Sequence, residues 1–291
     1  MAKSYQPSER RTYVVVGATG RTGREVERHL IDHGHEVRAV ARGRGVGVDD
    51  AAALERAFEH ADGAFVLVPF DLAGVDLHAR EDAIAERLER AIRRSGVPRV
   101  VLLGGLNAHL RRGTSLGAAL MEDRLLACSV PEPIVLRAGW FMENFTDGLG
   151  FRAQAANTGV FRTPFTAHRP MPTVAARDVG QRAADLLTQR LPRLGVHELH
   201  GHADLTMTEA TAILAEAAGL PGVRYEQLGY DAARTGMLAS GMPPSFADAV
   251  VETARSFNEG QPWALAPRDE ETTTSTSLRD WARGALAGVP A

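Results

Sequence analysis

Short apolar runs alternate with amphipathic segments over the first half of the chain. The apolar runs predict β-strands at residues 13–17, 36–41, 64–68, 99–103 and 134–137. Between them apolar positions recur at helical spacing, which predicts helices at 21–33, 49–59, 80–95 and 116–128. Because each parallel crossover needs a connecting helix, this alternation predicts an α/β fold with a doubly wound parallel (Rossmann) sheet.

The periodicity loosens after residue 140. Residues 161–172 are rich in Pro, Phe and Thr and predict a loop or a short hairpin. A helix at 176–189 and a strand at 196–199 follow, and we expect that strand to join the sheet. Further helices are predicted at 207–218, 231–240 and 245–257, and Ser277 with Asp280 resembles a capping box for a last helix. We therefore predict a dinucleotide-binding domain over 11–145, with 173–200 returning to its sheet, and a small C-terminal substrate domain or lid over 146–172 and 201–291.

Composition and charge narrow the class of protein. The formal net charge of -3 gives no electrostatic basis for binding nucleic acid or an anionic membrane, and no apolar run approaches a membrane span. Cys128 is the single cysteine, which suits a cytoplasmic location, and the N-terminus lacks a signal-peptide pattern.

We interpret His197, His200 and His202 as surface residues and expect no metal site. The oligomeric state stays open, and a monomer is compatible with the sequence.

The first predicted strand ends in a G-x-x-G-x-x-G turn at residues 17–23, and an amphipathic helix follows at once. Glycines let backbone N–H groups approach a phosphate, and the positive end of the helix then points at that anion. The strand before and the helix after make this a predicted dinucleotide site. Its expected cofactor-binding residues are Gly17, Thr19, Gly20, Arg21, Thr22 and Gly23 in the turn, and Val68, Pro69, Gly104, Gly105, Ala138 and Gly139 at the later strand ends.

Two arginines predict which dinucleotide is bound. Arg42 closes the second predicted strand, where many NAD enzymes carry an acidic residue for the ribose hydroxyls. A guanidinium suits a 2′-phosphate through paired hydrogen bonds, and Arg44 adds a second positive charge. We therefore expect NADPH in preference to NADH, the alternative being that both arginines are simply solvated.

An ordered set of motifs resembles the NmrA-like atypical short-chain dehydrogenases/reductases. The set comprises the glycine turn, the second strand ending in Arg42, L-R-x-x-x-F-M-E-N at 136–144 and R-D-V at 177–179. The resemblance covers nearly the whole chain and implies an NADP-binding doubly wound sheet with a small C-terminal substrate domain. The family includes quinone and imine reductases, natural-product ketoreductases and non-catalytic redox sensors.

The chain departs from this pattern in two places. The connection after Arg42 is short, and Gly47 stands where relatives place an Asp that contacts adenine, which predicts an open adenine side. The Tyr-x-x-x-Lys pair of classical members is absent, because Lys3 is the only lysine and precedes every tyrosine. Candidate proton donors or hydrogen-bond donors are then His109, Asn107 and Glu122.

Without that tyrosine, three mechanisms stay open: another side chain acts, the substrate stabilises its own oxyanion, or no hydride moves. The second is natural for a ketone of an aromatic polyketide in antibiotic biosynthesis, whose neighbouring phenol already bonds the carbonyl. Aromatic and methionine side chains predict a flat apolar slot for such a small-molecule aromatic substrate; they are Trp140, Phe141, Met142, Phe145, Phe161, Phe165 and Met237. Each could equally be core.

The leading hypothesis is therefore an NADPH-dependent ketoreductase. A quinone or imine reductase is the first alternative, since those acceptors also take hydride without a dedicated acid. A non-catalytic NADP-sensing regulatory protein is the alternative of another class, and a cyclase or isomerase that keeps the cofactor as a relic is a weaker third.

Overall fold

A computed structural model describes residues 10–72, 75–188 and 194–286. Its main feature is a six-stranded parallel sheet in the order β2-β1-β3-β4-β5-β9. These strands are β1 (Thr12–Val16), β2 (Glu36–Val40), β3 (Gly63–Val66), β4 (Arg99–Gly105), β5 (Glu132–Ala138) and β9 (Gly195–Leu199). The order reverses between β1 and β3, and a crevice at such a point is where open parallel sheets bind ligands. The predicted α/β fold is confirmed.

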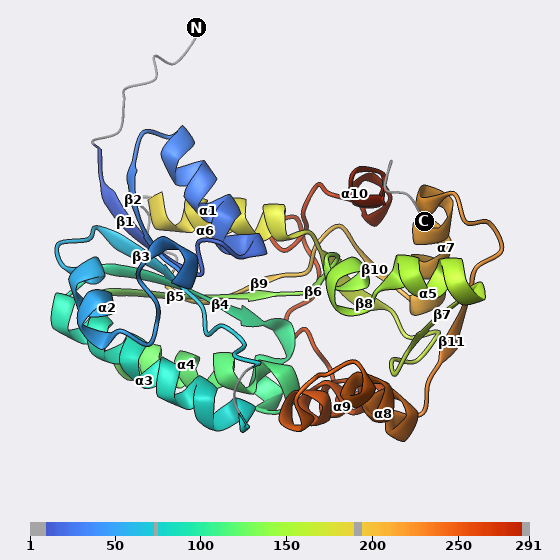
Figure 1. The fold of residues 1–291 in the computed structure, drawn as a ribbon. Helices are drawn as coiled ribbons and strands as arrows, with labels where there is room; N and C mark the ends of the chain where they lie inside the picture. Colours follow the sequence, from blue (N-terminus) through green and yellow to red (C-terminus); the bar gives the residue numbers. More distant parts are fainter. Residues whose placement is uncertain (1–9, 73–74, 189–193, 287–291) are drawn as a thin grey trace, which may run out of the picture.

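Helices cover both faces of this sheet (Figure 1). One face carries α1 (Arg21–Asp32) and α6 (Ala176–Thr188), and the other carries α2 (Ala51–Phe58), α3 (Leu77–Ser95) and α4 (Leu116–Ala127). The central strands are buried on both faces, as their unbroken apolar sequences require. Side chains of alternate strand positions therefore divide between two apolar cores, one under each helical layer.

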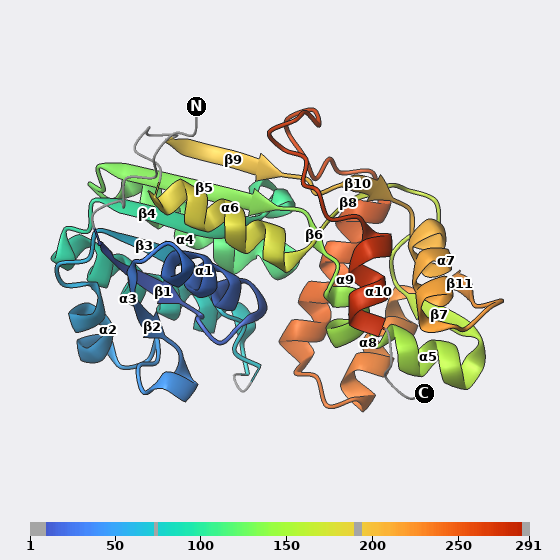
Figure 2. The ribbon, with the colours of Figure 1, turned by 90° about the horizontal axis from the view of Figure 1, so that it is seen from above.

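The second half of the molecule lies beyond the carboxyl ends of the strands (Figure 2). Its short strands form two small sheets, β10-β8-β6 and β11-β7, from β6 (Trp140–Phe141), β7 (Val160–Thr163), β8 (Met171–Val174), β10 (Ala203–Leu205) and β11 (Arg224–Gln227). Its helices are α5 (Phe151–Thr158), α7 (Met207–Ala218), α8 (Tyr230–Ala239), α9 (Pro244–Asn258) and α10 (Leu278–Leu286). A separate apolar core holds these elements together. The domain boundaries themselves stay a prediction.

Two sequence predictions need correction here. Residues 161–172 do not form a hairpin, because β7 pairs with β11 and β8 pairs with β10 and β6. His200 is not a surface residue: it is 2% exposed, and its Nε2 lies 3.1 Å from Glu198 Oε2. The helix predicted to end at residue 189 is described as far as Thr188, and residue 189 lies outside the described part.

No helix among the described residues is long and apolar enough to cross a membrane. The same residues contain no group of three or more His, Cys, Asp or Glu side chains arranged to hold a metal ion.

Candidate active site

The glycine turn between β1 and α1 is shaped by two different constraints. Gly17 has φ +75°, a left-handed conformation that side chains rarely adopt, and the Gly20 N–H donates to its carbonyl at 2.8 Å. A Cβ at Gly23 would lie 2.1 Å from the Gly17 carbonyl oxygen. Gly20 itself has an ordinary φ of -78° and caps α1 through backbone only. The first N–H groups of α1 have no partner within the helix, and Gly20 to Gly23 line a cavity, as anion binding requires.

Two cavities meet at this turn and form one groove along the strand ends. A cavity of about 420 Å³ contains Gly17, Thr19 and Arg42, and one of about 450 Å³ extends to Trp140 and Trp263. Both are lined by Gly20, Leu67, Pro69 and Phe70, so they adjoin each other at these residues. The structure also brings the other predicted cofactor-binding residues to the 450 Å³ cavity. They are Val68, Gly104, Gly105, Ala138 and Gly139 at the strand ends, and Arg21, Thr22 and Gly23 in the turn.

The two arginines after β2 differ in their surroundings. Arg42 is exposed at the mouth of the first cavity, and no ion pair involves it among the described residues. Arg44 lies 3.3 Å from Glu27 on α1 and is absent from the lining of either cavity. Arg42 is therefore the arginine free to meet a phosphate, whereas Arg44 is already neutralised by a carboxylate.

The short connection after Arg42 leaves carboxylates at the adenine side of the groove. Asp49 and Asp71 both line the first cavity, and Arg80 holds them at 2.6 Å and 2.8 Å. Gly47 lies next to the Arg42 side chain, since a Cβ there would be 3.6 Å from Arg42 Cγ. Acidic residues, Asp49 and Asp71, thus line this end of the groove, although Gly47 stands at the position where relatives place an Asp.

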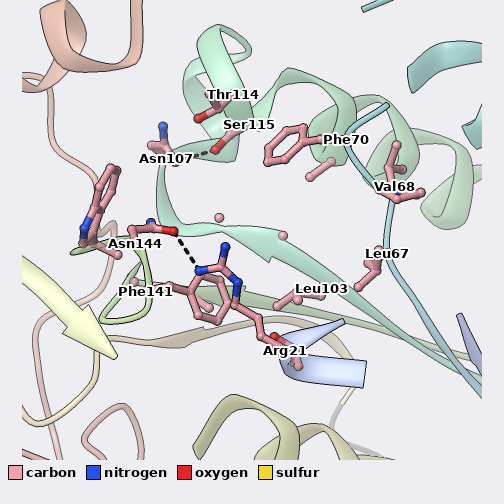
Figure 3. A pocket seen from close by; sticks show the side chains of 18 of the residues that line it. Arg21, Leu67, Val68, Phe70, Leu103, Asn107, Thr114, Ser115, Phe141 and Asn144 are labelled. Carbon is pink, nitrogen blue, oxygen red and sulfur yellow. Dashed lines mark hydrogen bonds between the residues drawn. The ribbon is translucent and has the colours of Figure 1, made fainter. Parts of the chain in front are cut away.

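Figure 3 shows the middle of the groove, where Arg21 reaches from α1 towards the segment after β6. Its Nη1 donates to Asn144 Oδ1 at 2.9 Å, and its guanidinium lies 5.9 Å from the centre of the Phe141 ring. Glu143 points the other way and accepts the Ala176 N–H and the Trp281 indole N–H. In the F-M-E-N motif, Phe141 and Asn144 therefore face the groove and the glutamate holds α6 in place.

The far end of the groove combines hydroxyl and amide groups with apolar walls. Ser115 donates to Asn107 Oδ1 at 2.7 Å (Figure 3). The Thr114 hydroxyl lies 3.1 Å from the Thr253 hydroxyl. Asn107 was a sequence candidate and does line the groove. Ser115, Thr114 and Thr253 were missed; the contact between Thr114 and Thr253 joins segments that are distant along the chain.

The predicted aromatic slot is only partly formed. Trp140 and Phe141 line the groove, and Trp263 joins them from a segment that the prediction did not include. Four predicted lining residues are instead buried in the apolar core of the second half; they are Met142, Phe145, Phe161 and Phe165. Met237 lies on α8, away from the groove lining. Core packing therefore accounts for most of the set, since these four side chains belong to one apolar core, in which Phe145 meets Phe161 edge to face.

Two of the three candidate donors serve structural roles. The ring nitrogens of His109 lie 3.0 Å from the Leu106 carbonyl and 3.1 Å from the Pro262 carbonyl, outside the groove lining. Glu122 forms a buried, two-point ion pair with Arg137, with a shortest contact of 2.6 Å. Neither side chain is part of the groove lining.

The described tyrosines also lie away from the groove lining. Tyr13 is buried at the start of β1, and the Tyr230 hydroxyl accepts a hydrogen bond from Asn258. Tyr225 donates to the Phe165 carbonyl, and burial raises its pKa to about 12, which makes it a weak acid. Tyr5 lies outside the described residues.

One buried acid in the groove lining was missed. Glu81 on α3 is 1% exposed, and burial raises the pKa of its carboxyl even though a hydrogen bond with His78, with 2.8 Å between Nδ1 and Oε2, lowers it. The sequence contained a signal, because Glu81 stands on the apolar stripe of α3 with Leu77, Ile84 and Leu88. An acidic residue on such a stripe is either paired or functional.

Comparisons with known proteins agree with this architecture. The model of the NmrA-like family matches residues 9–273. A (4-alkanoyl-5-oxo-2,5-dihydrofuran-3-yl)methyl phosphate reductase of Streptomyces griseus is 31% identical over 291 aligned residues, covering 92% of this chain and 95% of the relative. An NAD(P)H azoreductase of Xenophilus azovorans is 29% identical, covering 88% and 87%.

A solved structure shares the fold. The NADPH-dependent quinone oxidoreductase of Escherichia coli, complexed with NADPH, superposes with a TM-score of 0.76 at 18% identity, covering 94% of this chain and 99% of that one. A doubly wound sheet with a glycine turn and a groove at its strand ends defines a dinucleotide-binding α/β protein. Within that class, the chain belongs to the NmrA-like family.

Proposed function

We propose that this protein is an NADPH-dependent reductase that transfers a hydride to a planar, conjugated acceptor. The observation that carries the proposal is the single groove that runs from Arg42, past the glycine turn, to Trp140 and Trp263. It joins a phosphate-binding geometry to an apolar end. The reductases named above, for an azo compound, a quinone and a dihydrofuranone phosphate, support the reaction class.

The residues present fit a dinucleotide. The glycine turn and the N-terminus of α1 would hold the pyrophosphate, and Arg42 would bind the 2′-phosphate. Strand-end residues with small or absent side chains, Gly104, Gly105 and Ala138, leave room for a flat ring beside Leu103. When bound, the reduced nicotinamide supplies a hydride. The chain's own groups orient the acceptor and exclude water, because the walls of this end are mainly apolar.

The acceptor that we favour is a ketone of an aromatic polyketide, with a quinone or an imine next. Trp140, Phe141 and Trp263 offer aromatic surfaces for a fused ring system. Arg21 is the only basic side chain among the residues described as lining this end, and Asn144 already accepts from it, which disfavours a phosphorylated substrate. A phenol beside the reduced carbonyl would hydrogen-bond the oxyanion as it forms and replace the missing tyrosine.

The cofactor part of the proposal is tested by calorimetry on two arginine variants. Arg42→Ala should weaken NADPH binding by about 1.5–3 kcal/mol, the scale of charge-assisted hydrogen bonds, and leave NADH binding nearly unchanged. Arg44→Ala is the matched control and should have a much smaller effect, because Glu27 already pairs with Arg44. Equal affinity of the unaltered protein for NADPH and NADH would contradict the proposal.

The acceptor part is tested with 8-hydroxy-1-tetralone, a ketone beside a phenol, and its methyl ether. We expect the hydroxy ketone to be reduced about 10²–10⁴-fold faster, the range of a lost acid catalyst, and Tyr225→Phe to change kcat/KM by less than about 10-fold. Equal rates for the two ketones would overturn substrate assistance. Tight NADPH binding without oxidation by either ketone or by 1,4-naphthoquinone would favour the NADP-sensing alternative.

A further inference from the structure

We propose that Glu81 and His78 form a proton relay that supplies the proton consumed by ketone reduction. The pair lies on α3, in the wall between the catalytic groove and a second cavity of about 740 Å³. Glu81 lines the groove, and His78 lines the second cavity. This inference rests on the proposed reductase function. It gives that reaction an acid, Glu81, that lies outside the sequence motifs.

Glu81 faces the reacting end of the groove and has little access to bulk water. It packs against the start of α4, where a Cβ at Gly117 would lie 2.4 Å from Glu81 Cδ. Ser115 and Ala118, on either side of that glycine, both line the groove. The Gly117 N–H and His78 both hydrogen-bond the carboxyl, and burial nevertheless raises its pKa, which favours the protonated, donating form.

His78 connects the buried carboxyl to solvent. Its Nδ1 lies 2.8 Å from Glu81 Oε2, and its side chain is 31% exposed, compared with 2% for Glu81. Histidine is the side chain that exchanges protons most readily near neutral pH. The other charged side chains around the second cavity are Asp76, Arg112, Asp248, Glu252 and Arg255.

Reduction of a ketone to an alcohol consumes one proton, which the relay would supply. When the carbonyl carbon gains a hydride from NADPH, the C=O π pair moves to oxygen, and the alcohol forms only after one proton is added. A neighbouring phenol can lend that proton, but the resulting phenolate must then be reprotonated. In the proposed relay, the Glu81 carboxyl O–H gives its proton to this oxygen. His78 Nε2 takes a proton from solvent in the second cavity as its Nδ1–H gives one to the Glu81 carboxylate, so the ring stays neutral. The ring then regains its Nδ1–H form by proton exchange with solvent.

A purely structural role for Glu81, as the acceptor at the start of α4, makes different predictions. Glu81→Gln keeps an oxygen for the Gly117 N–H but cannot deliver a proton. We expect kcat for 8-hydroxy-1-tetralone to fall about 10–100-fold, with NADPH affinity within about 2-fold of the unaltered protein. Reduction of 1,4-naphthoquinone should fall much less, because its hydroquinone anion is a weaker base than an alkoxide. The matched control is Glu86→Gln, an exposed position on the same helix.

The second variant tests the solvent side of the relay. His78→Ala should lower ketone reduction about 3–10-fold, and imidazole added to the buffer should restore it, since the second cavity opens beside residue 78. In the unaltered protein the rate should decline at high pH as Glu81 loses its proton, and Glu81→Gln should lack that decline. Equal losses for ketone and quinone, or an unchanged pH profile, would overturn the relay. Failure of the unaltered protein to oxidise NADPH with either acceptor would overturn the reductase proposal and the relay with it.

Discussion

The two ends of the groove are built in different ways. At the glycine turn the surface is backbone, and its shape follows from three glycines within seven residues. At the aromatic end the surface is side chain, contributed by β6, the start of α4, α9 and the segment at Trp263. A local sequence motif can specify the first kind of surface. The second depends on how distant segments pack, so its chemistry can change without changing the fold.

Substituting an aromatic residue in the core should mainly lower stability, whereas substituting one in the groove lining should mainly lower activity. Phe161 is fully buried against Phe151 and Tyr225, so Phe161→Ala should lower the free energy of unfolding by about 3–5 kcal/mol. Phe141 is half-buried in the groove, so Phe141→Ala should cost less stability but lower kcat/KM for 8-hydroxy-1-tetralone. Urea denaturation and steady-state kinetics measure the two effects. Equal stability losses would show that the two rings belong to one core.

At the glycine turn, one added methyl group should weaken both stability and NADPH binding. In Gly23→Ala the new Cβ would lie 2.1 Å from the Gly17 carbonyl oxygen, so the turn must shift. We expect a loss of about 1–3 kcal/mol in stability and at least ~10-fold weaker NADPH binding, measured by calorimetry. Gly236→Ala on α8, where a Cβ meets nothing within 4 Å, is the control and should be neutral or stabilising. Unchanged NADPH affinity in Gly23→Ala would place the dinucleotide elsewhere.

The junction between the two halves should respond to acid. Burial tends to raise the pKa of Glu198, but hydrogen bonds from His200, Ala266 and Leu265 outweigh it and lower the pKa. The carboxylate therefore stabilises the fold above its unfolded pKa of about 4.3, and this contribution is lost as pH falls through the lowered folded value. Glu198→Gln should cost about 1–2 kcal/mol at pH 7 and progressively less below pH ~4. The exposed Glu259→Gln is the control, and a difference that stays constant with pH would contradict this assignment.

Sequence patterns predicted the sheet, its helices and the returning strand β9 because each depends on local periodicity. The segments that they predicted for the cofactor, the glycine turn and the strand ends, do meet at the groove, where backbone geometry dominates. They failed where one residue type has two uses. Phe141 and Phe145 both follow a strand end, yet one lines the groove and the other is core. The apolar stripe of α3 marks Glu81 as a buried acid, but no spacing within α3 reveals its contact with Gly117 of the next helix.

The path of the chain between the halves has a consequence for folding. The chain leaves the parallel sheet after β5, builds β6 to β8, returns for α6 and β9, and leaves again. Thr276, near the end, is hydrogen-bonded to Arg177 and Asp178 at the start of α6, so the last segment is tied back across roughly 100 residues. Closing such long loops is slow, because chain entropy is lost before the contacts that compensate for it form. The nucleotide end can therefore assemble early from neighbouring segments, whereas the aromatic end is completed only when the final part of the chain has docked.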